Sequence, residues 1–171
     1  MTRVIALILV AVSVPVETQA PAWFATWRLD VARSMLTSGM TGYVAGIRRI
    51  ETRGMGVRIV EEFIHSRGGV THLEWTGAFD GREYRVHGVD LYVTYDYRQV
   101  GERTLEGVVR VDGVITSTSR ETLSVDGRTL TIDTVSYNPQ QGSRATMLFE
   151  RVTPGPDRPA STPPAPVDGS I

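Results

Sequence analysis

The stretch from Ser119 to Ile132 constrains the fold most strongly, because it places Asp126-Gly127 between two runs of strand-forming residues. An Asp-Gly pair between alternating segments favours a tight β-hairpin, whose type I′ turn needs two residues with positive φ. Similar turn signals recur at Gly68-Gly69, Asp80-Gly81 and Asp112-Gly113. The sequence therefore predicts a protein built from successive antiparallel hairpins.

About ten strand-like segments follow one another between the turns, with almost no helical periodicity. One short helical turn is expected at 32–36. We predict strands at 24–31, 43–53, 57–66, 70–79, 82–87, 91–98, 104–111, 114–125, 128–137 and 143–152. Many short strands in series are typical of an all-β barrel or sandwich.

The composition limits the chemistry that is open to the chain. All 18 basic residues are arginine, so no lysine can form a Schiff base with a substrate or cofactor. The absence of cysteine excludes disulfides, thiolate nucleophiles and a lipidated cysteine. A net charge of −1 provides no field that would recruit nucleic acid or an anionic membrane. We expect no nucleic-acid partner and no cofactor.

Three segments of different composition divide the chain. Residues 1–22 are typical of a secretory signal peptide, with Arg3, an apolar run and an A-x-A pattern at Ala20-Pro21-Ala22. The apolar run has about 11 residues, fewer than the about 20 that span a bilayer. We expect a barrel domain at 23–153, periplasmic or secreted, with no stable membrane span after cleavage. The Pro-rich segment 154–171 is expected to be a disordered tail. An uncleaved anchor and a partner-binding tail are the alternatives.

Several motifs support a more specific assignment. Phe24 to Asp30 reads F-A-T-W-R-L-D, with Arg33-Ser34 behind it, and resembles the opening of small secreted bacterial lipocalin-like proteins. Further similar motifs lie at 80–84, 118–120, 123–131 and 149–151. The resemblance implies an antiparallel up-and-down calycin-like barrel of about eight to ten strands around a central cavity. It also implies that Trp27 closes one end of the barrel beneath Arg151, in a cation–π contact.

Arg120, Glu121 and Asp133 form one candidate site. With a two-residue turn at 126–127, Arg120 faces Asp133 and Glu121 faces Ile132 across the hairpin. If Arg120 points inward, its guanidinium and Asp133 would bind a carboxylate or another polar head group. Together with Glu121, they would also suit an isomerase or hydrolase. The alternative is an exposed ion pair on the barrel wall, worth about 0.2–1 kcal/mol.

The two hairpins that share this strand disagree about which of its faces is apolar. A tight turn at Asp112-Gly113 places Leu105 on one face, whereas the later hairpin places Leu123 and Leu130 on the other. A strand that changes faces needs a β-bulge. We predict that bulge between Ser117 and Glu121.

The three histidines suggest a metal site as a less favoured hypothesis. A tight turn at Gly68-Gly69 places His65 opposite His72, and the next hairpin places Glu74 opposite His87. Imidazoles and a carboxylate on one patch suit zinc or another divalent metal. However, the opposite face of these strands is the apolar one, so the patch would lie on the outer surface, where such residues are ordinary.

Aromatic residues are the remaining candidates for a ligand site. Tyr43, Trp75, Tyr84, Tyr92, Tyr95 and Tyr97 could line a cavity or simply form the core. Trp75, Tyr84 and Tyr95 are the predicted cavity residues. The sequence predicts an exported barrel that binds a small hydrophobic or amphipathic molecule in its interior. A cavity-based enzyme and a filled barrel with a structural role at the cell envelope are the alternatives.

Overall fold

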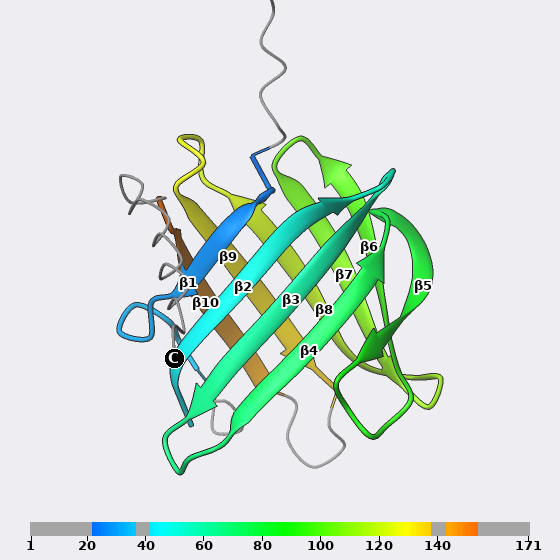
Figure 1. Ribbon diagram of the computed structural model, residues 1–171, viewed down its shortest axis with the longest axis horizontal. Helices are drawn as coiled ribbons and strands as arrows, with labels where there is room; N and C mark the ends of the chain where they lie inside the picture. Colours follow the sequence, from blue (N-terminus) through cyan, green and yellow to red (C-terminus); the bar gives the residue numbers. More distant parts are fainter. Residues whose placement is uncertain (1–21, 37–41, 138–142, 154–171) are drawn as a thin grey trace, which may run out of the picture.

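Alternation of inward apolar and outward polar side chains builds ten antiparallel strands that close into a barrel (Figure 1). The computed structural model describes residues 22–36, 42–137 and 143–153. Each strand pairs with its neighbours in the chain, and β1 pairs with both β2 and β10. The predicted antiparallel up-and-down barrel is confirmed. The strands are β1 Ala25–Leu29, β2 Tyr43–Arg53, β3 Gly56–His65, β4 Val70–Gly77, β5 Asp80–His87, β6 Val93–Gly101, β7 Thr104–Val111, β8 Val114–Leu123, β9 Thr129–Ser136 and β10 Ser143–Arg151.

The strand bounds agree with the predictions to within a few residues, and β2 and β7 match at both ends. The helical turn expected at 32–36 is wrong: the chain makes a turn there, and Met35 then forms a β-bridge with Thr146. No helix in the described ranges is long and apolar enough to cross a membrane. The predicted signal peptide, except for Ala22, and the predicted tail lie outside the described residues.

The two Asp-Gly hairpins are built differently. Asp112 and Gly113 both have positive φ, 50° and 79°, as a type I′ turn requires. At the later turn only Gly127 of the central pair has positive φ, 65°, and Ser124 donates its N–H to the carbonyl of Thr129 at 2.9 Å. That loop is therefore wider than predicted. Its centre is unchanged, so the predicted pairing of Arg120 with Asp133 is confirmed.

Two β-bulges decide which side chains enter the barrel. On β8, Arg110 pairs with Ile115 and Val109 pairs with Ser117, which leaves Thr116 as the extra residue. The predicted bulge exists, but it lies just before the predicted interval. On β2, a similar shift at Val44 turns Tyr43 toward the interior.

Aromatic side chains pack one end of the barrel shut. Trp75 stacks on Phe79 with ring centroids 6.2 Å apart, and Trp27 is fully buried. The Cζ atom of Arg151 lies 5.6 Å from the centroid of the Trp27 ring, the contact that the family resemblance implies. The Arg151 guanidinium also donates to the backbone carbonyls of Ala22, Phe24 and Gly127. We call this the closed end.

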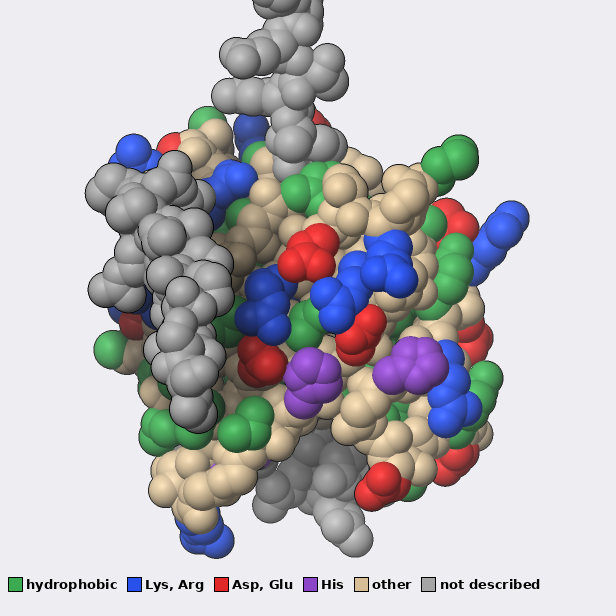
Figure 2. All heavy atoms as spheres, in the orientation of Figure 1, with side chains coloured by type: hydrophobic (Ala, Val, Ile, Leu, Met, Phe, Trp, Pro, Cys, Tyr) green, Lys and Arg blue, Asp and Glu red, His purple; other side chains and the backbone are tan. Residues whose placement is uncertain are grey.

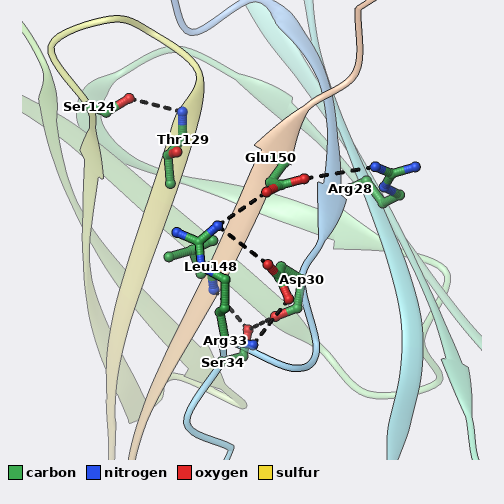
Figure 3. Close-up of polar contacts among 8 residues, drawn as sticks. All are labelled: Arg28, Asp30, Arg33, Ser34, Ser124, Thr129, Leu148 and Glu150. Atoms are coloured by element: carbon green, nitrogen blue, oxygen red, sulfur yellow. Dashed lines mark hydrogen bonds and ion pairs between the residues drawn. The ribbon is translucent and has the colours of Figure 1, made fainter.

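Polar residues of the segment from Phe24 to Ser34 connect β1 to β10 where the barrel closes (Figure 3). We call this β1–β10 junction the seam. These strands share only three paired positions, so side chains supply further contacts. The Ser34 hydroxyl donates to the Asp30 carbonyl at 2.6 Å and accepts the N–H of Leu148 at 3.0 Å. The Arg33 guanidinium contacts Glu150 at 3.2 Å. The polar residues of the motif thus hold the barrel closed.

Candidate functional site

An interior cavity of about 180 Å³ lies in the half of the barrel away from the closed end. The cavity is not fully enclosed. The barrel end opposite the closed end, where β3 turns into β4 and β7 turns into β8, is called the open end. Hydroxyl groups line it from Tyr43, Tyr95, Tyr97, Ser117, Ser119 and Thr134. The apolar part of the wall consists of Phe63, Leu73, Val109, Ile132 and Met147.

Exposed large hydrophobic side chains gather around the open end. They lie on the strand ends and on the described loops at that end, where the alternating pattern of the strands stops. Examples are Ile64, Val70, Leu91, Tyr92, Val114 and Tyr137, each between 45% and 70% exposed. The end of the barrel that holds the cavity is therefore bordered by exposed apolar side chains.

A buried ion cluster, formed by Arg48, Glu61 and Glu121, lies in the cavity wall. Arg48 on β2 donates from Nη1 to Glu61 Oε1 at 2.6 Å, and from Nη2 to both carboxylate oxygens of Glu121 at 2.9 and 3.0 Å. Arg48 and Glu61 are cross-strand partners, whereas Glu121 reaches them from β8 across the interior. Arg48 is 2% exposed and Glu121 is fully buried.

Burial and pairing act against each other in this cluster. Burial raises the pKa of the Glu121 carboxyl, and Arg48 only partly offsets that effect. Burial alone would lower the pKa of Arg48, but Glu121 and Glu61 raise it well above its usual value. The pKa values of Tyr95 and Tyr97 are raised chiefly by burial, so both phenols stay neutral. Glu121 is therefore a carboxyl group that gains a proton more readily in the fold than in water.

We expect this shift to appear in the pH dependence of stability. The folded state holds the Glu121 proton more tightly than the unfolded state does. The stability gained from this proton is therefore complete below the unfolded pKa of about 4.3, and it is lost as pH rises through the higher folded pKa. The free energy of unfolding of the wild type, minus that of Glu121→Gln, should decrease as pH rises through this range. Urea titrations between pH 4 and 8 measure this difference, and a difference that grows with pH would contradict the assignment.

Two of the predicted ligand residues lie in the cavity wall and two lie beside it. Glu121 and Tyr95 line the cavity. Trp75 lies beneath it in the closed-end packing and donates its indole N–H to the carbonyl of Tyr95 at 3.3 Å. Tyr84 contacts Trp75 edge-on at 5.7 Å, and its hydroxyl donates to Asp80 at 3.0 Å. Trp75 and Tyr84 thus support the cavity without forming its lining.

Arg120 and Asp133 point out of the barrel, because their strands turn Glu121 and Ile132 inward. Arg120 is 57% exposed and contacts Glu106 at 2.9 Å. Asp133 accepts a hydrogen bond from the Thr146 hydroxyl at 2.6 Å. The interior head-group site suggested for Arg120 and Asp133 is therefore not formed, and the two lie on the outer wall.

The predicted pairing of His65 with His72 is wrong. The β3–β4 loop spans 66–69 rather than two glycines, so His72 lies opposite Glu62. His65 is on the inner side near the open end, where its ring centroid is 4.8 Å from that of Tyr43. Glu74 does pair with His87, as predicted.

The outer face of β2, β3 and β4 carries ion pairs instead of the proposed metal cluster. Arg58 binds Glu74 at 2.7 Å, and His72 contacts Glu62 at 3.4 Å. Figure 2 looks onto this face, where acidic and basic side chains alternate beside histidines. Within the described ranges, no three His, Asp or Glu side chains are placed to hold a metal ion.

Arg48 and Glu61 are site residues that the sequence interpretation missed. The β2–β3 hairpin register could have indicated them. With the turn centred on Gly54 and Met55, Arg48 pairs with Glu61, and both lie on the same face as the paired residues Ile50 and Ile59. Charged residues on an otherwise apolar strand face would have marked an interior polar site.

The comparisons with known proteins identify no relative: no family model matches the chain, and no curated protein matches it. The barrel itself is compatible with a calycin-like fold.

Proposed function

We propose that this chain is an exported lipocalin-like barrel that binds a small amphipathic molecule in its interior. The observation that carries the proposal is the open cavity with a polar, charged floor at the buried ion cluster and an apolar rim. Pockets that combine an apolar wall with a few placed polar groups are typical of ligand sites. Export rests on the signal-like pattern at 1–22, which gives a periplasmic or secreted location.

The size of the cavity limits what it can enclose. An apolar cavity of about 150 Å³ holds a molecule the size of benzene, so the interior of about 180 Å³ suits one ring or a head group. A longer ligand would extend through the open end and lie against the exposed hydrophobic side chains there. The proposal therefore favours an amphipathic ligand over a large apolar one.

The cavity supports ligand binding over a filled barrel with a purely structural role. An acid–base enzyme is a second candidate, favoured by the position and raised pKa of Glu121. Arg120 and Asp133 cannot assist from the outer wall, so that chemistry would depend on Glu121. A product mass that appears with wild type and not with Glu121→Gln would support it.

A matched pair of variants tests the binding proposal. Ser117 lines the cavity, whereas its neighbour Thr118 points outward toward Tyr137. We expect Ser117→Phe to fill the mouth and abolish binding of the neutral amphipathic probe 1-octanol, while Thr118→Phe leaves binding within about twofold. Isothermal titration calorimetry measures binding, and near-ultraviolet circular dichroism checks the fold. Equal binding by both variants would place the ligand outside the barrel.

Native mass spectrometry of the protein purified from its source complements this test. We expect an extra mass that disappears on denaturation and identifies the class of the ligand. Repeated absence of any adduct, together with no probe binding, would favour the filled-barrel alternative.

A further inference from the structure

The buried ion cluster contains more negative than positive charge. One guanidinium, that of Arg48, serves two carboxylates, and both of its Nη atoms are already engaged. The other polar groups of the described cavity wall are hydroxyls. With both carboxylates ionised, the cavity therefore carries an unbalanced charge of one electron in a poorly solvated interior.

An anionic ligand finds no free cation among the described residues of this wall. The Nη atoms of Arg48 point at Glu61 and Glu121, and its Nε is buried without a hydrogen-bond partner among the described residues. Other arginines near the cavity, such as Arg120, lie on the outer surface. A carboxylate or phosphate head group would thus meet two carboxylates and, in the described part of the cavity wall, no accessible guanidinium.

The aromatic side chains of the cavity wall also suit a cationic ligand. Tyr43 stacks on Phe63 with centroids 4.7 Å apart, and Tyr95 contacts Tyr97 edge-on at 5.9 Å. The four rings line the same cavity as Glu61 and Glu121, and the Tyr97 ring already contacts a cation, with Arg48 Cζ 5.8 Å from its centroid. Aromatic faces beside carboxylates are a common means of recognising ammonium groups.

We propose that the ligand of this barrel is an amphipathic organic cation, whose ammonium group binds beside Glu61 and Glu121 and whose apolar part extends toward the open end. This inference rests on the proposed interior binding function. A proton on Glu121 and the ammonium group are alternative ways to balance the same charge, so each should weaken the other.

Four probes of one chain length separate charge from hydrophobicity: octylammonium, octyltrimethylammonium, 1-octanol and octanoate, all below micelle-forming concentrations. Isothermal titration calorimetry on the full chain at pH 7 should give at least one of the ammonium probes an affinity about tenfold or more above that of octanol, with octanoate weakest. Octanol or octanoate binding as tightly as both ammonium probes would overturn the cation inference and leave the binding function standing. Binding of none of the four would overturn both.

Removing one carboxylate tests the assigned residues. Glu121→Gln keeps the shape but balances the cluster, so the preference for octylammonium over octanol should fall about tenfold. Glu62→Gln, which removes an outward carboxylate from β3, should leave the preference unchanged. Unchanged preference in Glu121→Gln would overturn the assignment of Glu121.

The wild type provides a test that needs no variant. The titratable groups facing Glu121 are Arg48 from β2, Glu61 from β3, and Tyr95 and Tyr97 from β6. The arginine and the tyrosines keep their charge state between pH 4 and 7. Octylammonium affinity should therefore fall as pH is lowered from 7 to 4, while octanol affinity stays level. An octylammonium affinity independent of pH would contradict the proposal.

Discussion

Arg48→Met is expected to destabilise the barrel by about 3–5 kcal/mol at pH 7, because it leaves two buried carboxylates without their counter-charge. The deficit should shrink as pH falls, since burial already raises the pKa of Glu121 and its protonation removes part of the repulsion. Urea unfolding at several pH values, followed by tryptophan fluorescence, measures both effects.

The next residue along β2 supplies the control. Arg49 points outward, is 35% exposed and pairs with Glu62 at 3.0 Å, so Arg49→Met should cost no more than about 1 kcal/mol. The triple variant Arg48→Met, Glu61→Leu and Glu121→Leu should recover most of the lost stability, because the cluster then holds no buried charge. Equal costs at 48 and 49 would show that the cluster is hydrated rather than buried.

Trp27→Ala is the second substitution with a large expected effect, about 3–5 kcal/mol. Its side chain is fully buried in the closed-end packing, and its indole N–H donates to the carbonyl of Trp23 at 3.2 Å. Removing the ring leaves a cavity where Trp27 meets Arg151. Thermal and urea unfolding of this variant and of Trp27→Phe, which keeps a ring in place, measure the effect.

Arg151→Met distinguishes the contribution of the Trp27 ring from that of the guanidinium above it, because it removes the cation and keeps the ring. The Arg151 side chain is exposed at the barrel end, so loss of its cation–π contact should cost only about 0.5–1 kcal/mol. A loss as large as that of Trp27→Ala would mean that the carbonyl contacts of Arg151, rather than the indole packing, hold the closed end together.

Local turn chemistry explains why most strand partners could be predicted. A turn centred between Asp126 and Gly127 fixes which residues face each other, and Arg120 and Asp133 follow from that centre even though the loop is wider than a type I′ turn. The same reasoning failed at Gly68-Gly69, where both glycines have positive φ but belong to a longer loop. A dipeptide indicates where a chain turns; the hydrogen bonds around it decide how many residues take part.

The site was harder to predict than the fold, because its parts come from distant strands. The need for a bulge on β8 followed from two conflicting registers, but those registers did not fix its position, and the bulge forms at Thr116. The contact between Arg48 and Glu121 joins residues 73 apart in sequence across the barrel interior. No local pattern on either strand encodes that contact, since it exists only once the sheet has closed.

The seam between β1 and β10 also sets an order of folding. Every other strand pair joins neighbours in the chain and can form as soon as both are made, whereas Trp27 must wait for Arg151. Until β10 is present, β1 and β9 each expose an unpaired backbone edge, the kind of surface through which chains aggregate. A chain truncated before residue 143 should therefore be prone to association even though most of its hairpins are intact.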